Sequence, residues 1–322
     1  MRALRFEQMG SLSGLKVATV DLPVPGPGEV LVKVEAAAIN PSDVKNVLGK
    51  MKQTTLPRTP GRDFAGRVEK GPPDLVGRFV FGTGGDLGFL RDGPHAEYLT
   101  VPVEAAALRP DRLDAAQAAA MGLAYMTAWA ALIDAAKLRA GETVLITGVT
   151  GAVGSAAARI ARFHGAKVLG AIRQRAEQQG NPDLPVDVYV HLADGPLHEL
   201  AAAATAGHGA DVVLDVVGGP LFEPCLKCLA HRGRQIAIAS TGDGKATFDL
   251  VDFYHREGRL FGVDTLKLGF AESGAVLRCL LPGIEAGVFQ PPQLETIALD
   301  QAVAAYQAIN AGVARNKQVI VF

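Results

Sequence analysis

The chain has 322 residues, of which 48% are hydrophobic and 20% are charged. This length exceeds what one ordinary hydrophobic core holds and predicts two domains, and this composition excludes a disordered or fibrous protein. The 32 basic and 33 acidic residues leave a net charge of −1 without a block of like charge, so we expect a small-molecule partner, no nucleic acid and no membrane.

Short apolar runs separated by turn residues fill residues 1–100. Strands are expected over 15–22 and 30–39, on either side of the Pro/Gly cluster Pro23–Gly28. The N-terminal segment MRALRFEQMG lacks the apolar core and cleavage site of a secretory signal, and the three cysteines fit a reducing compartment. We expect a β-rich N-terminal domain and a cytoplasmic location.

The next segment, Ala115–Ile133, is rich in alanine and nearly free of charge. It approaches the length of a membrane span, about 20 residues, yet it contains Gln117 and Thr127 and stands alone in mid-chain. We predict a helix that is buried in the protein rather than in a membrane.

From Thr143 to Ala239, apolar strands alternate with helical stretches. This alternation predicts a parallel sheet with crossover helices, and therefore an α/β fold. The last part of the chain does not continue the alternation. We therefore expect a discontinuous first domain, 1–120 completed by 266–322, and a doubly wound parallel-sheet domain over 121–265.

A glycine motif follows the first strand of this alternation. Val144–Thr147 leads into Gly148, Gly151 and Gly154, then into a helix and a second strand that ends at Ile172. In such a βαβ unit the glycines let backbone N–H groups approach a pyrophosphate, and the helix N-terminus adds partial positive charge. The segment predicts a dinucleotide site.

The residues after the second strand distinguish the cofactors. Arg173, Gln174 and Arg175 stand where an acid would bind the adenosine ribose of NADH. A guanidinium instead suits the additional phosphate of NADPH. We therefore predict NADPH, with Arg173 and Arg175 as cofactor-binding residues.

Short-chain dehydrogenases share this glycine spacing and need a Tyr-x-x-x-Lys pair for proton transfer. None of the five tyrosines belongs to such a pair. The motif also lies behind a long β-rich segment, whereas short-chain enzymes begin with it. The sequence therefore excludes this class.

Seven segments along nearly the whole chain carry a resemblance to a known family. They are VEAAAINPSDVKNVLG, TPGRDFAGRV, GPHAEYLTVP, MGLAYMTAWAAL, GVTGAVG, GADVVLDVVGGPLFEPCLKCLAHRGRQIAIAS and NKQVIVF. In this order and spacing they resemble the medium-chain dehydrogenase/reductase superfamily, in its zinc-free, zeta-crystallin-like quinone oxidoreductase branch. The resemblance implies a GroES-like catalytic domain, a Rossmann domain, a cofactor in the cleft between them and a homodimer.

Metal-using members of the superfamily place a cysteine at the position of Asn40 and a His–Glu pair at the positions of Arg62 and Asp63. The three cysteines of this chain lie elsewhere. Cys225 and Cys228 form one C-x-x-C pair, but structural zinc needs a second pair. We expect no metal.

Without zinc, conjugate reduction is the expected reaction, because no Lewis acid would stabilise a developing alkoxide. Hydride added to a quinone or an α,β-unsaturated carbonyl moves charge to an oxygen that an amide N–H can stabilise. The resemblance places Asn40 and Thr127 beside the nicotinamide, as catalytic and cofactor-binding residues. It implies further cofactor contacts at Gly148, Thr150, Gly151, Ala152, Val153, Val216, Val217, Gly218, Ala239, Ser240, Phe261, Gly262, Val263, Asn316 and Lys317.

Two other functions stay open. The stretch RLFGVDTLKL is also similar to acryloyl-CoA reductase-like members, which reduce an enoyl thioester by the same bond chemistry. A structural or regulatory member that binds a dinucleotide without catalysis would share these motifs. In addition, many relatives hold the adenosine phosphate with a tyrosine where this chain has Leu192, which leaves more of that role to Arg173.

Overall fold

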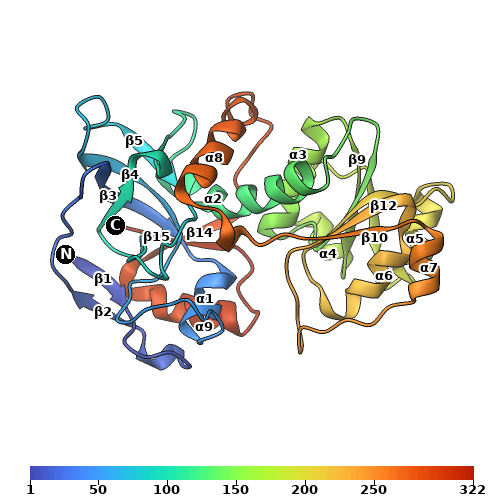
Figure 1. Ribbon diagram of the computed structural model, residues 1–322, viewed down its shortest axis with the longest axis horizontal. Coiled ribbons are helices and arrows are strands. Elements are labelled where there is room, and N and C mark those ends of the chain that lie inside the picture. The colour runs from blue at the N-terminus through green and yellow to red at the C-terminus, as the bar shows by residue number, and fades with distance from the viewer. The chain divides into compact units, whose positions relative to one another are not determined.

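The computed structural model describes residues 1–322, which form two compact units (Figure 1). Unit 1 comprises Met1–Met126, Leu266–Ala286 and Pro291–Phe322, and unit 2 comprises Thr127–Thr265 and Gly287–Gln290. The chain leaves unit 1, builds unit 2 and returns to complete unit 1.

Unit 1 is built on a seven-stranded sheet. The order is β14 (Leu294–Ala298), β15 (Lys317–Val321), β3 (Glu29–Ala38), β4 (Asp63–Lys70), β5 (Phe79–Gly82) and β7 (Ala107–Leu108), and β6 (Tyr98–Pro102) also pairs with β3. A separate antiparallel pair consists of β1 (Arg2–Arg5) and β2 (Lys16–Thr19). The antiparallel pairing of β15 with β3 joins the red C-terminal strand to the blue N-terminal part in Figure 1.

Two apolar clusters form the core of unit 1. Alternate residues of β3, Val30, Val32 and Val34, are buried with Phe64 of β4 and Leu99 of β6. A second cluster joins strand residues to the two neighbouring helices α1 (Pro41–Val47) and α9 (Ala302–Asn310). Another helix of unit 1, α8 (Phe270–Glu285), packs along β5 and β7.

Unit 2 contains a six-stranded parallel sheet, which confirms the predicted doubly wound α/β fold. Its order is β10 (Val188–His191), β9 (Lys167–Ile172), β8 (Thr143–Thr147), β11 (Ala210–Asp215), β12 (Leu229–Ala237) and β13 (Arg259–Gly262). The central strands are continuous apolar runs, as a sheet covered on both faces requires.

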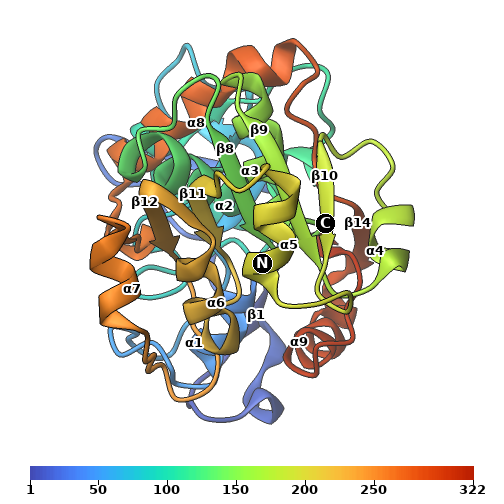
Figure 2. The ribbon, with the colours of Figure 1, turned by 90° about the vertical axis from the view of Figure 1, so that its right-hand side faces the viewer.

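Helices cover this sheet. Alternate strand residues Leu145, Leu169 and Val213 form one cluster with side chains of α5 (Leu197–Ala204) and α6 (Phe222–Lys227), which lie in front of the strands in Figure 2. α3 (Ala152–Phe163) packs on β8 and β9, and right-handed crossovers place it on the opposite face. The short helices α4 (Arg175–Gln179) and α7 (Leu250–His255) follow β9 and precede β13.

The predicted buried helix is present as α2 (Ala115–Trp129), which continues into a π-helical turn over Ala130–Ala135. Residues Ala115–Ala135 form the one helix that is long and apolar enough to span a membrane. Since 72% of its apolar window is buried inside the protein, this helix has the burial of a core element.

Candidate functional site

The glycine motif forms the turn between β8 and α3. Gly148 follows β8 with φ +55°, in the left-handed region that favours glycine, and Gly151 directly precedes α3. A Cβ on Gly154 would lie 2.3 Å from the carbonyl oxygen of Gly148. The missing side chains therefore let the turn fold tightly and leave the N–H groups at the start of α3 open to a phosphate. The predicted residues Thr150, Ala152 and Val153 belong to this turn and to the start of α3.

This turn lies where the strand order of the sheet reverses. The chain runs from β8 to β9 and β10 and then returns to β11 on the other side of β8. In open α/β sheets such a switch point opens a crevice outside the carboxyl ends of the strands, and ligands bind there. The predicted residues Val216–Gly218, Ala239–Ser240 and Gly262–Val263 follow or end β11, β12 and β13, at the same edge.

Asp215 organises the loop after β11. Its side chain is fully buried, and Oδ1 accepts hydrogen bonds from Thr147 Oγ1 at 3.0 Å, Val217 N at 3.1 Å and Gly218 N at 2.9 Å. Gly218 has φ +67°, and a Cβ there would lie 2.4 Å from the carbonyl oxygen of Ala239. The loops after β8, β11 and β12 are thus held close together, and their residues fit a bound dinucleotide.

Charged side chains follow β9. The Arg173 side chain is 85% exposed, and its Nε lies 3.5 Å from Oε1 of Glu177. The other Glu177 oxygen accepts a hydrogen bond from Thr150 Oγ1 at 3.3 Å, and Arg175 Nη2 lies 2.7 Å from Asp194 Oδ2. The structure therefore brings an acid to the glycine turn, although sequence reasoning found none that would favour NADH.

A group of polar side chains is buried in unit 1. Asn40 precedes α1, Asp43 lies in α1, and Asp63 and Lys317 begin β4 and β15. We call these four residues the polar cluster. Asn40 and Asp43 are 4% and 1% exposed, and the side chains of Lys317 and Asp63 are 6% and 0% exposed.

Hydrogen bonds fix the orientation of the Asn40 amide. Its Nδ2 donates to Asp63 Oδ2 at 2.9 Å, and Lys317 Nζ donates to its Oδ1. An ammonium can only donate and a carboxylate can only accept, so a flipped amide would lose both bonds. Nδ2 carries a second N–H besides the one that it donates to Asp63.

Burial shifts the ionisation of this cluster. Burial raises the pKa of Asp43 to about 7, against the lowering effect of its hydrogen bond from Asn40 N at 2.7 Å. Burial also lowers the pKa of Lys317, and the carboxylates of Asp63 and Asp43 oppose that shift. The Lys317 ammonium lies 3.8 Å from Asp63 Oδ2, which makes this a buried ion pair.

The polar cluster does not suit zinc. The positions that the resemblance equates with zinc ligands hold an amide, Asn40, a cation, Arg62, and a carboxylate, Asp63. Lys317 forms an ion pair with that carboxylate. Zinc sites use thiolate, imidazole and carboxylate ligands, and adjacent cations would repel the metal. No group of three or more His, Cys, Asp or Glu side chains in residues 1–322 is arranged to hold a metal ion.

The remaining predicted residues are less closely tied to either site. Thr127 lies in α2 and belongs to unit 2, where it is 9% exposed. Asn316 precedes β15 in unit 1, and its carbonyl oxygen accepts a hydrogen bond from Gln318. Phe261 lines a cavity together with Arg234 and Arg259. Arg259 is the first residue of β13. The roles of these residues stay predictions.

His95 is buried in unit 1. Its Nε2 lies 3.3 Å from the carbonyl oxygen of Ala38, and its Nδ1 lies 3.0 Å from the Tyr306 hydroxyl. Burial lowers the pKa of His95 to about 4, so the ring is neutral at pH 7, with Nε2 donating and Nδ1 accepting. These contacts give His95 a structural role.

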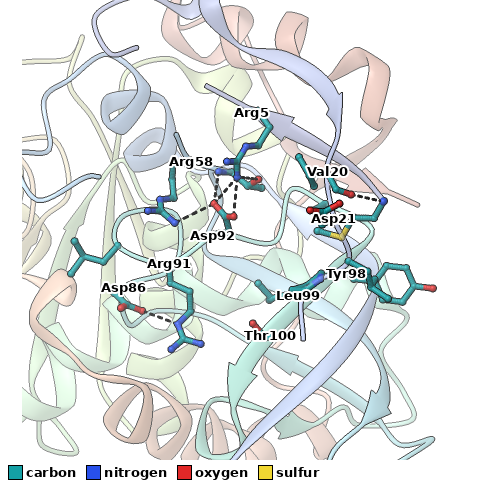
Figure 3. Close-up of a pocket in the computed structure, with 17 residues that line it drawn as sticks. Arg5, Val20, Asp21, Arg58, Asp86, Arg91, Asp92, Tyr98, Leu99 and Thr100 are labelled. Carbon is teal, nitrogen blue, oxygen red and sulfur yellow. Dashed lines mark hydrogen bonds and ion pairs between the residues drawn. The ribbon is translucent and has the colours of Figure 1, made fainter. Parts of the chain in front are cut away.

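A cavity of about 590 Å³ in unit 1, which we call the N-terminal pocket, contains three arginines (Figure 3). Arg5 and Arg58 both point at Asp92, with Nη1 to Oδ1 distances of 2.8 and 3.2 Å. Arg91 pairs with Glu29 and lies 3.6 Å from Asp86. Each guanidinium here has a carboxylate partner.

Sequence reasoning gave no role at these sites to Asp43, Glu177 and Asp63, whereas the resemblance already implied that Asp215 borders the cofactor. Asp43 follows Asn40 at the spacing of a helix capping box, and Glu177 follows Arg173 at the spacing of a helical ion pair, so both carried a local signal. Asp215 ends a buried strand directly before the loop that it organises. Asp63 stood out only as a missing zinc ligand.

Comparisons with known proteins agree with both units. Residues 26–111 match alcohol dehydrogenase GroES-like domains, and residues 152–280 match zinc-binding dehydrogenases. A zinc-type alcohol dehydrogenase-like protein of Schizosaccharomyces pombe is 36% identical over 316 residues, which cover 96% of this chain and 93% of that protein. The quinone oxidoreductase of Mus musculus is 30% identical over 324 residues, which cover 99% and 97%.

The fold agrees as well. The crystal structure of an alcohol dehydrogenase superfamily protein from Novosphingobium aromaticivorans superposes with a TM-score of 0.89 at 31% identity, over 100% of this chain and 99% of that one. A GroES-like unit, a parallel-sheet Rossmann unit with a dinucleotide turn, and relatives of matching length thus agree. The chain belongs to the medium-chain dehydrogenase/reductase superfamily, in its quinone oxidoreductase branch, and is an oxidoreductase.

Proposed function

We propose that the protein is an NADPH-dependent, zinc-independent reductase of quinones or α,β-unsaturated carbonyl compounds. The orientation of Asn40 carries this proposal. Lys317 and Asp63 fix the amide in a buried site, and its second N–H would be available to a substrate. Such a donor stabilises an oxygen that gains negative charge during reduction.

The chain would divide the work between its units. The glycine turn and the loops after β11 and β12 would hold the dinucleotide, whose nicotinamide supplies the hydride when bound. Asn40 would donate its second N–H to the acceptor oxygen of the substrate. The Lys317 ammonium on Oδ1 polarises the amide and strengthens that donor. Solvent would supply the proton that completes the reduction.

The zinc-independent part of the proposal follows from the same residues. An alcohol dehydrogenase needs a Lewis acid for its alkoxide. The polar cluster offers a metal one amide, one carboxylate that is paired with Lys317 and one carboxyl group that is bonded to Asn40 N. Stoichiometric zinc in the purified protein would contradict this part.

Arg173 supports NADPH as the cofactor. An exposed ion pair contributes only about 0–1 kcal/mol, so Arg173 can leave Glu177 and bind a phosphate at little cost. Glu177 favours the opposite choice, because an acid near the glycine turn can accept hydrogen bonds from the ribose of NADH. We give Arg173 more weight than Glu177 in this choice, because the Arg173 side chain is 85% exposed and the Glu177 side chain is 24% exposed.

Calorimetric titration with NADPH and NADH tests this choice. We expect Arg173→Met to weaken NADPH binding at least about tenfold, the loss of one charge-assisted hydrogen bond, and to leave NADH binding unchanged. Glu177→Gln should not weaken either cofactor. If NADH binds as tightly as NADPH and Glu177→Gln weakens it, the acid selects the cofactor and the NADPH assignment is wrong.

Activity tests the role of Asn40. NADPH consumption would be followed with quinones, 2-alkenals, enones and an enoyl-CoA, which also separates the thioester alternative. We expect Asn40→Ala to lower kcat about 100-fold, as for loss of an oxyanion donor, and the exposed Asn310→Ala to change nothing. If the unmodified protein consumed no NADPH with any compound of the panel, the result would favour a non-catalytic member of the family.

We further propose a cytoplasmic homodimer. β13 is an edge strand of the parallel sheet, and its Leu260 is 43% exposed, so a second copy could pair there. Cys225, Cys228 and Cys279 are all free thiols, as in a reducing compartment. Light scattering on the purified protein would show the oligomeric state.

A further inference from the structure

A second cavity, of about 480 Å³, lies in unit 2 at the edge of the sheet opposite the glycine turn. Glu142, which lines it, precedes β8, whereas Gly148 follows β8. β8 therefore separates Glu142 from Gly148 by about 20 Å, which is six steps of about 3.3 Å. We call this cavity the basic pocket after its cationic lining: Lys137, Arg139, His231, Arg232, Arg234 and Arg259.

The sheet register brings two of these cations together. Arg234 of β12 and Arg259 of β13 are direct partners in the parallel pairing. Like charges opposite each other destabilise a sheet unless a counter-charge is present. Arg234 has one, because its guanidinium lies 2.7 Å from Glu142 Oε2 and also donates to Ala136 O at 2.9 Å. Arg259 has none.

The carboxylates around the pocket are already engaged. Glu257 binds Arg232 at 2.8 Å and His231 at 3.2 Å, and Asp211 binds His208 at 3.1 Å. Lys137, Arg139 and Arg259 are exposed and form no ion pair. Asp134 interacts electrostatically with Lys137, so Arg139 and Arg259 are the two cations of the pocket that have no carboxylate partner.

Backbone strain gathers at the same place. Lys137, Arg232 and Glu257 have φ of 52°, 63° and 48°, and residues 1–322 contain only one other non-glycine residue with positive φ. The left-handed conformation is strained for residues that carry a Cβ, and such strained residues cluster at ligand sites. Two of the three line the pocket, and the third holds Arg232 in place.

We propose that the basic pocket binds a small phosphorylated molecule through Arg139 and Arg259, at a site separate from the cofactor. A phosphomonoester or pyrophosphate carries the two or more negative charges that this surplus needs, and guanidinium forks match its oxygens. The volume suits a small ligand, and Ala135 and Ala136 provide an apolar wall for the rest of the molecule. The N-terminal pocket also contains arginines, but each is paired there.

Calorimetry with inorganic pyrophosphate tests this proposal, at fixed low salt and in the presence of saturating NADPH. The cofactor occupies the glycine turn, so pyrophosphate should still bind with a stoichiometry of about one. We expect Arg139→Gln/Arg259→Gln to weaken binding at least about tenfold. The matched pair Arg58→Gln/Arg91→Gln in the N-terminal pocket should leave it unchanged.

Further arms separate the alternatives. Gly154→Ala obstructs the glycine turn and should retain pyrophosphate binding without NADPH, so failure of the cofactor assignment would not affect this result. The pocket variants should unfold at the same urea concentration as the unmodified protein. No saturable binding, equal binding by the Arg139/Arg259 variant, or an affinity that changes with protein concentration through pairing at β13, would overturn the proposal.

Discussion

The polar cluster of unit 1 and the basic pocket of unit 2 both gather charged side chains, yet they balance charge in opposite ways. In the polar cluster Lys317 and Asp63 are almost fully buried, and both contact Asn40. In the basic pocket Arg139 and Arg259 are exposed and have no carboxylate partner. The polar cluster pairs its charges within the protein. The basic pocket leaves unpaired positive charge that faces solvent.

This difference determines what each site can tolerate. A charge removed from water must be paired, because an unpaired one costs several kcal/mol. A solvated charge needs no partner and contributes little to folding. Changes in the polar cluster should therefore alter stability and activity together, whereas changes in the basic pocket should alter ligand binding alone.

The largest effect is expected when the buried ion pair is broken. Lys317→Met leaves the Asp63 carboxylate buried with only the hydrogen bonds from Asn40 and Leu123 N. We expect the free energy of unfolding to fall by about 3–5 kcal/mol. Urea denaturation of the protein would measure this change. The exposed comparison, Arg259→Gln, should change it by less than about 0.5 kcal/mol.

The double variant Lys317→Met/Asp63→Asn sharpens this comparison. It removes both charges, so it should recover part of the lost stability while the Asn40 amide loses its fixed orientation and activity stays low. A loss below about 1 kcal/mol for Lys317→Met alone would mean that the pair behaves like a surface ion pair.

The fold was predictable because its signals are local. The run Val144–Thr147, the glycines after it and the alternation up to Ala239 each depend on neighbouring residues, and together they specify a parallel sheet with a dinucleotide turn. The buried helix at Ala115 likewise followed from its own composition. Local patterns of this kind survive in the folded protein because packing reinforces them.

The site was less predictable because its contacts are not local. Asn40 and Lys317 lie 277 residues apart in sequence, and only the pairing of β15 with β3 brings them together. No periodicity indicates that Lys317 binds an amide. The unpaired positive charge of the basic pocket likewise depends on contacts that are distant in sequence. The register of β12 and β13 brings Arg234 beside Arg259, and Glu142 pairs with Arg234 alone.

A smaller effect is expected for Asp43, because burial changes the protonation of its carboxyl group and does not involve an ion pair. Its folded pKa of about 7 exceeds the ordinary value of about 3.9, so the folded protein binds this proton more tightly than the unfolded chain does. Stability from this group is complete below about pH 4 and is lost as the pH rises toward about 7, with a slope of at most about 1.4 kcal/mol per pH unit.

Asp43→Asn removes that proton and keeps an oxygen for the Asn40 N–H. We expect the variant to show a flatter dependence of unfolding free energy on pH between about 4 and 7, while the exposed Asp111→Asn keeps the original slope. An unchanged slope in Asp43→Asn would show that this carboxyl ionises normally when folded, so that the charges of Lys317 and Arg62 outweigh burial at this position. The polar cluster would then be a fully ionised network, and its contrast with the basic pocket would rest on pairing alone.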